Sequence, residues 1–439
     1  MIGIFAKNTL MTFLTRVATA ISTIIITVIM ARVLGPRGQG IYSVAVLFPS
    51  LLLIFTGFGM NSAVVYFLGK GKHSPRQILG TSIIFNLLVS LFTVLIGLVI
   101  IYFFGERFFP GIETIYLFLS LFLVPLILFF NLGCQVLLGL QKINKYNFIS
   151  FLQSFFFLIS VALLLLTMRF GVTVTILSQI LSYVVAIIIV AFIIVGELEG
   201  IDFRPNYKYL KESLVYGLKT HLAGIFDFLH SRVDLFLINF FVNPFSAGIY
   251  FASVRLAEGV WLFSSSTSTV LFPKVASEKD PKKLNEFTPL VCRNVLFFSA
   301  LIIICLFTIS GSLITFLYST SFSGAILPFR IILVGILAIS GCNILSIDLA
   351  ARGRPMLNTY AIGVSVLLNI LLNIFLIPKW GIGGAALATT ISYIFMFMFT
   401  VVIYSKLSNN KIRNIIFLRK EDFVVYKNLF LAIKSKLII

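Results

Sequence analysis

Long, uninterrupted apolar runs place this chain in a membrane. The clearest of them extends from Ile78 to Phe104 without one charged residue. A helix needs roughly 20 apolar residues to cross the hydrocarbon core of a bilayer. Within that core every backbone N–H and C=O must be paired inside the protein, and helices achieve this along a continuous apolar segment. The sequence therefore predicts an all-α polytopic membrane protein.

About twelve such spans are predicted along the 439 residues. Only 11% of the residues are charged, whereas a soluble domain has about 25%. Several spans exceed the minimum length, so we expect those helices to tilt or to extend beyond the hydrocarbon. The predicted spans are 9–34, 41–68, 78–104, 114–140, 146–168, 172–195, 213–241, 246–272, 290–318, 325–350, 357–377 and 381–405.

Lysine and arginine are distributed unevenly between the two sides of the predicted membrane. The net charge of +19 could by itself indicate nucleic-acid binding. If the N-terminus lies in the cytoplasm, however, 25 of the 34 basic residues fall on that side and 5 on the other. This asymmetry follows the positive-inside rule. We therefore expect both termini in the cytoplasm and no nucleic-acid partner.

Short patterns recur at an offset of about half the chain. "GPRGQGIY" at residues 35–42 returns as "NPFSAGIY" at 243–250. "FGVTVTILSQILSYVV" at 170–185 similarly resembles "WGIGGAALATTISYIF" at 380–395. Because the order and the offset are both kept, the chain is interpreted as two six-helix halves. An even number of spans gives both halves the same orientation, with a pseudo-two-fold axis along the membrane normal and the substrate where they meet.

The repeat sets the domain boundaries that we expect. Residues 1–196 form an N-terminal six-helix bundle and residues 213–405 a C-terminal one. A mixed-charge cytoplasmic linker at 197–212 joins them, and a basic cytoplasmic tail at 406–439 follows. The whole is expected to be a V-shaped transporter that alternates between inward- and outward-facing states.

The first repeated pattern is interpreted as a tight hairpin on the outer side of each bundle. Pro36 and Pro244 would end the first helix of each half, since proline cannot continue a helix. Gly40 and Gly248 would allow the close turn into the second helix. These four residues are therefore predicted to be structural.

A polar stripe runs along the first span. Thr12, Arg16, Thr19 and Thr23 are spaced by four, three and four residues, which places them on one face of a helix. At the repeat offset of 208, the three threonines correspond to positions on a similar stripe in the seventh span. We expect both stripes to line one cavity between the bundles; the second comprises Thr220, Asp227 and Ser231, with Asp234 three residues further on.

Charged residues inside predicted spans mark candidate sites. Each costs about 2.5 kcal/mol or more near the bilayer centre, so it should face water or a partner. Arg16 lies on the first stripe without a nearby acid, Arg255 lies three residues from Glu258, and Arg330 shares a helix face with Asp348. Arg232 lies off the second stripe, so it either contributes to function or only extends toward the interface. Candidate substrate-binding cations are thus Arg16, Arg255, Arg232 and Arg330, and candidate ion-coupling residues are Asp227, His230, Asp234 and Glu258.

Motifs of catalysis are not found. The sequence contains no nucleophile elbow, phosphate loop or nucleotide fingerprint, and its four cysteines lack metal-ligand spacing. We therefore expect a protein that is not an enzyme and has no cofactor or metal. A proton or sodium ion could still serve as the coupling ion.

The segments "ARVLGPRGQGIYSVAVLFPSLL", "RVDLFLINFFVNPFSAGIYFASVRLAEGV" and "WGIGGAALATTISYIF" resemble those of polysaccharide-repeat-unit flippases, or O-antigen translocases, of the multidrug/oligosaccharidyl-lipid/polysaccharide exporter superfamily. The resemblance implies an alternating-access flippase in the bacterial cytoplasmic membrane. Its substrate would be a polyprenyl-pyrophosphate-linked oligosaccharide, and a cationic lumen would hold the anionic headgroup. It also implies membrane lipids, a polysaccharide polymerase and glycosyltransferases as partners.

Three other functions are weighed against this one. A cation-coupled antiporter of drugs, or an exporter of another lipid-linked precursor, belongs to the same superfamily. Each acid of the first half lies in a loop or at a helix end, which disfavours a drug exporter with its coupling carboxylate there. A membrane glycosyltransferase or polymerase would need a larger outer loop than the one of about ten residues around Glu106, "GERFFPGIE". A channel would need a repeated filter sequence.

Overall fold

The computed structural model describes residues 2–167, 171–278, 280–419 and 422. Within these ranges the chain forms helices and connecting turns, and no strand. The first half contains α1 (Ile2–Thr56), α2 (Met60–Lys70), α3 (Pro75–Phe108), α4 (Thr114–Leu121), α5 (Leu123–Gly139), α6 (Ile143–Thr167) and α7 (Gly171–Leu198). The second contains α8 (Tyr207–Phe241), α9 (Pro244–Ser277), α10 (Pro281–Tyr318), the 3-10 helix η1 (Thr320–Ala325), α11 (Ile326–Ala351), α12 (Pro355–Ser408) and α13 (Ile412–Ile416).

Eight helical segments of the described chain are long and apolar enough to cross a membrane. Two of them, α1 and α12, each turn back at a glycine and so supply two spans. Helices α8 and α9, of 35 and 34 residues, are as long as these segments but have a more polar sequence than they do. Together these elements provide twelve spans, which confirms the predicted all-α fold. Residues 420–421 and 423–439 of the basic tail lie outside the described residues.

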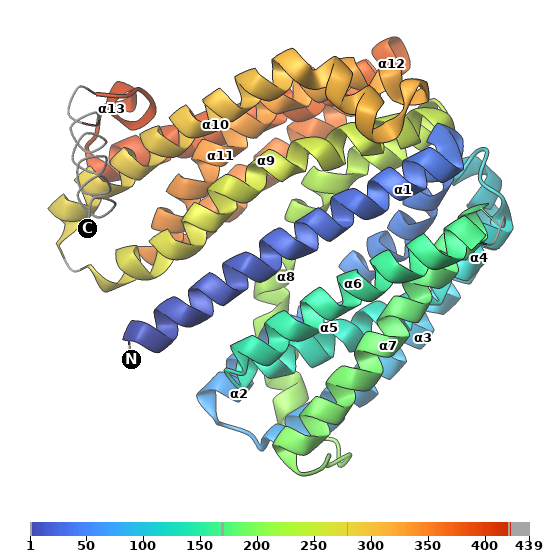
Figure 1. The fold of residues 1–439 in the computed structure, drawn as a ribbon. Helices are drawn as coiled ribbons and strands as arrows, with labels where there is room; N and C mark the ends of the chain where they lie inside the picture. Colours follow the sequence, from blue (N-terminus) through green and yellow to red (C-terminus); the bar gives the residue numbers. More distant parts are fainter. Residues whose placement is uncertain (1, 168–170, 279, 420–421, 423–439) are drawn as a thin grey trace, which may run out of the picture.

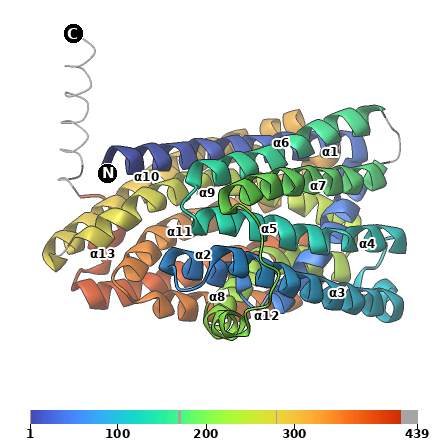
Figure 2. The same ribbon diagram turned by 90° about the horizontal axis from the view of Figure 1, so that it is seen from below.

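The bundles meet along α1 and α9 (Figures 1 and 2). Helices α3, α5, α6 and α7 pack around α1 on one side, and α10, α11 and α12 pack around α9 on the other. The ribbons converge near the first repeated pattern and diverge toward the N-terminus and α13 (Figure 1). The charge distribution predicts this diverging end to be cytoplasmic. The structure thus has the V shape expected for one state of an alternating-access transporter.

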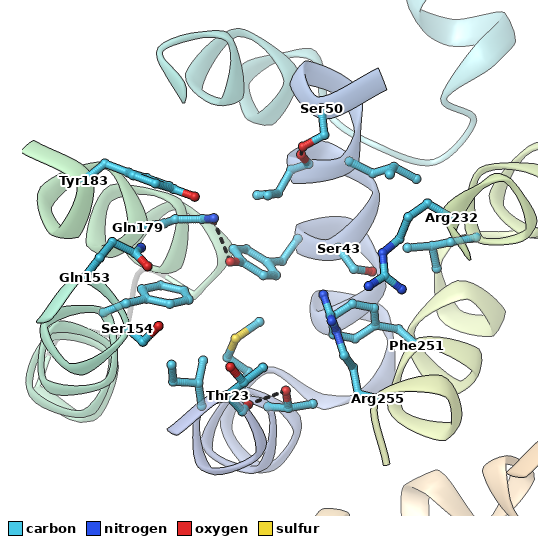
Figure 3. Close-up of a pocket in the computed structure, with 18 of the residues that line it drawn as sticks. Thr23, Ser43, Ser50, Gln153, Ser154, Gln179, Tyr183, Arg232, Phe251 and Arg255 are labelled. Carbon is cyan, nitrogen blue, oxygen red and sulfur yellow. Dashed lines mark hydrogen bonds between the residues drawn. The ribbon is translucent and has the colours of Figure 1, made fainter. Parts of the chain in front are cut away.

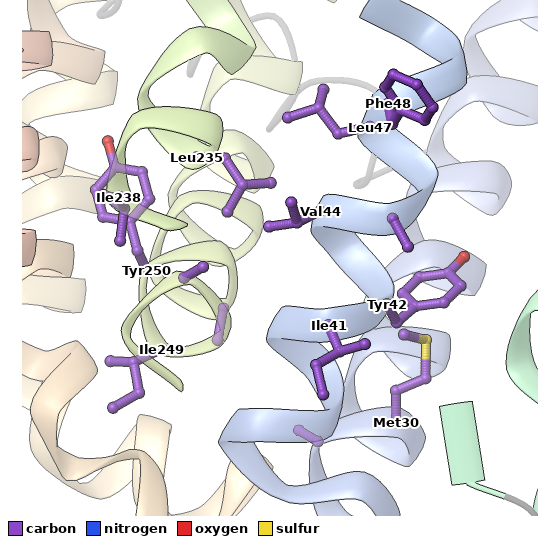
Figure 4. Packing of buried hydrophobic residues seen from close by; sticks show 14 of the residues in the cluster. Met30, Ile41, Tyr42, Val44, Leu47, Phe48, Leu235, Ile238, Ile249 and Tyr250 are labelled. Carbon is purple, nitrogen blue, oxygen red and sulfur yellow. The ribbon is translucent and has the colours of Figure 1, made fainter. Parts of the chain in front are cut away.

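A shared apolar core joins the bundles at the converging end. In Figure 4, Val44 of α1 points toward Leu235 of α8, and both are buried. Ile249 and Tyr250 of α9 belong to the same cluster. Burying each such side chain contributes roughly 1.5–3 kcal/mol. This packing closes the seam on the predicted outer side.

The prediction that Gly40 and Gly248 allow the turn between the first two helices of each half is wrong. Both Gly40 and Gly248 lie inside helices, and the first turn is made at Gly35, whose φ is 67°. A Cβ on Gly40 would lie 1.7 Å from the carbonyl oxygen of Pro244, and one on Gly248 would lie 1.9 Å from that of Pro36. The pattern is therefore repeated because the two copies pack backbone to backbone across the pseudo-two-fold axis.

Each proline of the pattern begins a helix. Pro36 follows the turn at Gly35, and Pro244 is the first residue of α9, where Asn243 caps the helix by accepting from the N–H of Ser246. Proline suits this position because its missing N–H would be unpaired in any case. The preceding helix ends before each proline, as predicted.

Helix α8 bridges the two bundles. Its first turns pack on the N-terminal bundle, where Tyr209 is fully buried and shares a hydrogen bond of 3.0 Å with Ser82. Gly217 packs so closely on the turn between α1 and α2 that a Cβ would lie 2.4 Å from the carbonyl oxygen of Phe58. The later turns of α8 pack on α9 and α12. Both ends of the helix are therefore anchored, one in each bundle.

The connection before α8 is held at the predicted cytoplasmic surface by polar contacts. Lys72 and His73 contact Glu212 at 2.7 and 3.0 Å, and Arg76 donates to the carbonyl oxygen of Leu198. The backbone N–H of Arg204 donates to Asp202 and lowers the pKa of that carboxyl group. These contacts order the connection between the two bundles.

Gly381 makes the turn between the last two spans with a φ of 56°. We expect Gly381→Ala to destabilise the protein by about 1 kcal/mol, because an L side chain is strained at positive φ. The helical Gly383 provides a matched control, because a Cβ at either glycine would meet no described atom within 4 Å. Thermal unfolding in detergent should show a lower midpoint for Gly381→Ala only. Equal midpoints would contradict the assigned conformation.

Candidate cation-lined cavity

Three cavities follow one another along the seam between α1 and the pair α8 and α9. The first, of about 240 Å³, lies nearest the converging end and is bordered by α1, α6, α7, α8 and α9 (Figure 3). The second, of about 250 Å³, shares Thr23, Arg232 and Arg255 with it. The third, of about 470 Å³, contains Arg16 and lies closest to the diverging end. Together they extend from the predicted cytoplasmic end toward the middle of the seam.

Two arginines and one glutamate form the charged centre of this seam. Nη1 of Arg232 lies 2.7 Å from Oε1 of Glu258, and Nη1 of Arg255 lies 3.0 Å from Oε2 of the same carboxylate. Their side chains are a quarter to a third exposed. One carboxylate bridging two guanidinium groups leaves this cluster with a net charge of +1. The cluster can therefore attract an anion without exposing two uncompensated cations.

Arg255 retains a donor for a ligand. Its Nε atom is buried and has no hydrogen-bond partner among the described residues. The guanidinium group lies 5.0 Å from the ring centre of Phe251, which supports it by a cation–π contact. A buried donor left unpaired costs about 1–3 kcal/mol. An anionic acceptor in the cavity would remove that cost.

Arg232 lines the first cavity. The interpretation that its side chain only extends toward the membrane interface is therefore wrong. The cavity face of α8 consists of Phe228, Arg232 and Leu235. Each is one residue beyond a member of the predicted stripe, a rotation of about 100° on a helix. The spacing therefore predicts correctly that α8 contributes to the cavity, but the face it predicts is rotated by about one residue from the face that lines the cavity.

The stripe of the first span lies along the seam, although Thr19 is not among the residues that line the three cavities. Thr23 lines the first two cavities and Thr12 the third. Thr12 also accepts a hydrogen bond of 2.9 Å from Asn147 of α6. Thr19, one turn before Thr23, is half-buried and accepts from the Thr23 hydroxyl through its carbonyl oxygen.

Arg16 lies apart from the charged centre. It is exposed, and its Nη1 donates to Oγ1 of Thr269 across the seam at 3.2 Å. Seven residues of helix separate it from Thr23, which corresponds to about 10 Å along the axis. Arg16 therefore lies at the predicted cytoplasmic entrance, where an incoming anion would meet it first.

Two of the candidate coupling residues belong to a separate buried cluster inside the C-terminal bundle. Asp234 accepts hydrogen bonds from the Tyr250 hydroxyl, from Thr389 at 3.2 Å and from the Leu235 N–H at 2.8 Å. Nε2 of His230 lies 3.1 Å from the hydroxyl groups of both Ser365 and Ser392. This face of α8 points toward α12, away from the seam.

The remaining candidates occupy other surroundings. Thr220 and Asp227 are exposed on α8, and the Ser231 hydroxyl donates back to the carbonyl oxygen of Asp227. None of these three is among the residues that line the three cavities. Arg330 donates to Ser310 at 2.7 Å and lies over the ring of Phe307, between α10 and α11. It is not part of the charged centre.

Sequence analysis did not single out the uncharged polar wall that faces the arginines. Tyr42 of α1 donates to Oε1 of Gln179 on α7 at 2.7 Å. Gln153 of α6 donates to Ser182 at 3.1 Å, and Tyr183 completes the wall. Figure 3 shows Gln153, Gln179 and Tyr183 on the side opposite the arginines. Gln153 and Gln179 lie inside predicted apolar spans, and this could have indicated the wall, because an amide group within the bilayer needs a hydrogen-bond partner.

A family model described as polysaccharide biosynthesis protein matches residues 29–327. An uncharacterised membrane protein of Methanocaldococcus jannaschii is 27% identical over 85% of this chain and 91% of its own length. A capsular polysaccharide biosynthesis protein of Staphylococcus aureus is 23% identical over 88% of this chain and 96% of its own. A probable low-salt glycan biosynthesis flippase of Haloferax volcanii is 26% identical, over 43% of this chain and 41% of its own.

Solved structures share the fold. A lipid II flippase in an inward closed conformation superposes with a TM-score of 0.78 at 18% identity, covering 93% of this chain and 89% of its own. An inward-facing multidrug transporter gives a TM-score of 0.72 at 14% identity, covering 89% and 94%. At these identities the likeness concerns the architecture alone.

Proposed function

The chain belongs to the polysaccharide biosynthesis protein family of multi-pass membrane transporters, and on that premise we propose that it flips a polyprenyl-pyrophosphate-linked oligosaccharide across the cytoplasmic membrane. The observation that carries this proposal is the net positive cluster of Arg232, Glu258 and Arg255 inside the seam. A pyrophosphate diester presents the acceptor oxygens and the negative charge that two guanidinium groups bind best.

The proposed path follows the seam. The headgroup would meet Arg16 at the entrance and then bind between Arg232 and Arg255, while the lipid tail stays in the bilayer. Binding would free one arginine from Glu258, since the carboxylate and the phosphates compete for the same donors. The substrate would be released on the other side once the converging ends of α1 and α9 separate.

Flipping of a defined substrate tests the proposal. The purified chain in proteoliposomes would be given a fluorescent polyprenyl-pyrophosphate oligosaccharide or, separately, a cationic dye. We expect translocation of the lipid-linked oligosaccharide and none of the dye, because a net positive cavity repels cations. Transport of the dye with no flipping would instead favour the alternative, a cation-coupled drug exporter.

We propose further that the coupling ion binds at Asp234. This carboxylate is 4% exposed and is surrounded by neutral donors on α8, α9 and α12. A proton or sodium ion would neutralise this carboxylate, which no buried cation contacts directly in the described structure.

If the chain serves surface polysaccharide assembly, a polysaccharide polymerase and glycosyltransferases are its proposed partners.

Asp234→Asn should make flipping insensitive to the ion gradient and slow it at least tenfold, since the amide cannot bind and release the ion. Flipping would be measured in proteoliposomes with an imposed proton or sodium gradient. Asp227→Asn, an equivalent change at an exposed position of the same helix, separates the buried site from a general effect on α8. Full gradient dependence in Asp234→Asn would exclude this coupling site.

A further inference from the structure

The first cavity has two chemically different walls. The wall from α8 and α9 contains the two arginines, whereas the wall from α6 and α7 contains Gln153, Gln179 and Tyr183. Of the described residues that line this cavity, only the arginines are formally charged. A ligand that spans the cavity therefore meets cations at one end and neutral donors and acceptors at the other.

The neutral wall is built and held in place. Tyr42 fixes the Gln179 amide through its hydroxyl group at 2.7 Å, and Ser182 fixes the Gln153 amide at 3.1 Å. In each amide this contact uses only one of the two polar atoms, and an amide offers two donors and two acceptor lone pairs. Both side chains are only half-buried and line the cavity. They retain hydrogen-bonding capacity for a ligand.

The size of the cavity limits what that wall can contact. At about 240 Å³ the cavity is below the usual range of small-molecule sites, which begins near 300 Å³. A wall of this extent can contact only the part of a lipid-linked oligosaccharide that lies next to the phosphates.

Resting on the proposed function, we propose that Gln153 and Gln179 form a subsite for the first sugar, the one bonded directly to the pyrophosphate. Amides pair with hydroxyl and acetamido groups, and the rings of Tyr42 and Tyr183 offer apolar contact to the sugar faces. An uncharged sugar fits this wall, because a uronic acid would place its carboxylate against neutral amides while the phosphates occupy the two arginines. The arginines would then hold the phosphates common to all such lipids, and the glutamines would select the sugar.

Binding to three probes tests this assignment. The protein in nanodiscs would be titrated with polyprenyl pyrophosphate alone, with the same lipid bearing N-acetylglucosamine, and with the lipid bearing glucuronic acid. We expect the neutral sugar to tighten binding by about tenfold, the effect of one or two neutral hydrogen bonds. The uronic acid should give no gain over the bare lipid.

Gln179→Leu and Gln153→Leu should each lower the gain from N-acetylglucosamine and leave binding of the bare lipid unchanged. Gln135→Leu, the same change on α5 outside the cavities, is the matched control and should keep the gain. An undiminished gain in both cavity variants would overturn the subsite. If the wild type binds the bare lipid but prefers no sugar, the subsite is wrong and the flippase proposal stands. Absence of binding to all three lipids would overturn both.

Discussion

Replacing Arg255 by glutamine is expected to slow flipping of the lipid-linked oligosaccharide by about 30- to 150-fold, the equivalent of losing one charge-assisted contact of about 2–3 kcal/mol. The change reduces the net charge of the central cluster from +1 to 0, because Arg232 and Glu258 then neutralise each other. It also removes the buried Nε donor that lacks a partner in the described structure. The cavity would keep its shape and lose its attraction for phosphate.

Initial flipping rates in proteoliposomes, at equal protein content, measure this effect. Arg107→Gln is a suitable control, since Arg107 is exposed at the end of α3 and outside the three cavities. A wild-type rate in Arg255→Gln would show that the cluster has no role in substrate binding. A second variant, Arg255→Lys, should restore part of the rate, because it keeps the charge without the bidentate geometry.

Gly40→Ala is expected to abolish transport by preventing closure of the predicted outer side. The added Cβ would lie 1.7 Å from the Pro244 carbonyl oxygen, a backbone atom that cannot move away independently. Helices α1 and α9 would have to separate, which disfavours the state described here. Gly248→Ala should act alike, because its Cβ would lie 1.9 Å from the Pro36 carbonyl oxygen.

Spin-label distances between the converging ends of α1 and α9 would follow this change. We expect a longer distance in Gly40→Ala, with each bundle still folded. Gly69→Ala serves as the control, because Gly69 is helical and a Cβ there would meet no described atom within 4 Å. A wild-type distance with normal transport would contradict the proposed role of the contact.

Much of the fold could be predicted from the sequence because apolar length alone limits it. Most predicted spans agree with the helices to within a few residues, apart from ends that extend beyond the membrane, such as Pro281–Tyr318 against 290–318. The predicted spans 41–68 and 114–140 are each divided between two helices in the structure. The repeated "GIY" pattern predicts a shared structural role, but the prediction that its glycine makes the turn is wrong. Spacing shows that a glycine recurs, whereas only the structure shows that Gly40 and Gly248 face each other.

The site was predictable only in part, for a geometric reason. The spacing of Arg255 and Glu258 fixes their pairing on one helix, but Arg232 reaches the same carboxylate from another helix. The rotation of α8 decides that Arg232 faces the cavity and Asp234 faces α12, and spacing along one helix cannot determine rotation. Gln153 and Gln179 approach each other only through packing of α6 and α7.

The most direct test of a substrate cavity between the bundles is the reactivity of a single cysteine at Ser154. This residue lines the first cavity on α6, and the change would be made in a variant lacking the four native cysteines. A membrane-impermeant maleimide, added on the side of the N-terminus, should label Ser154→Cys, and the polyprenyl-pyrophosphate oligosaccharide should protect it. Absence of labelling from both sides, or labelling that the substrate does not slow, would contradict the account.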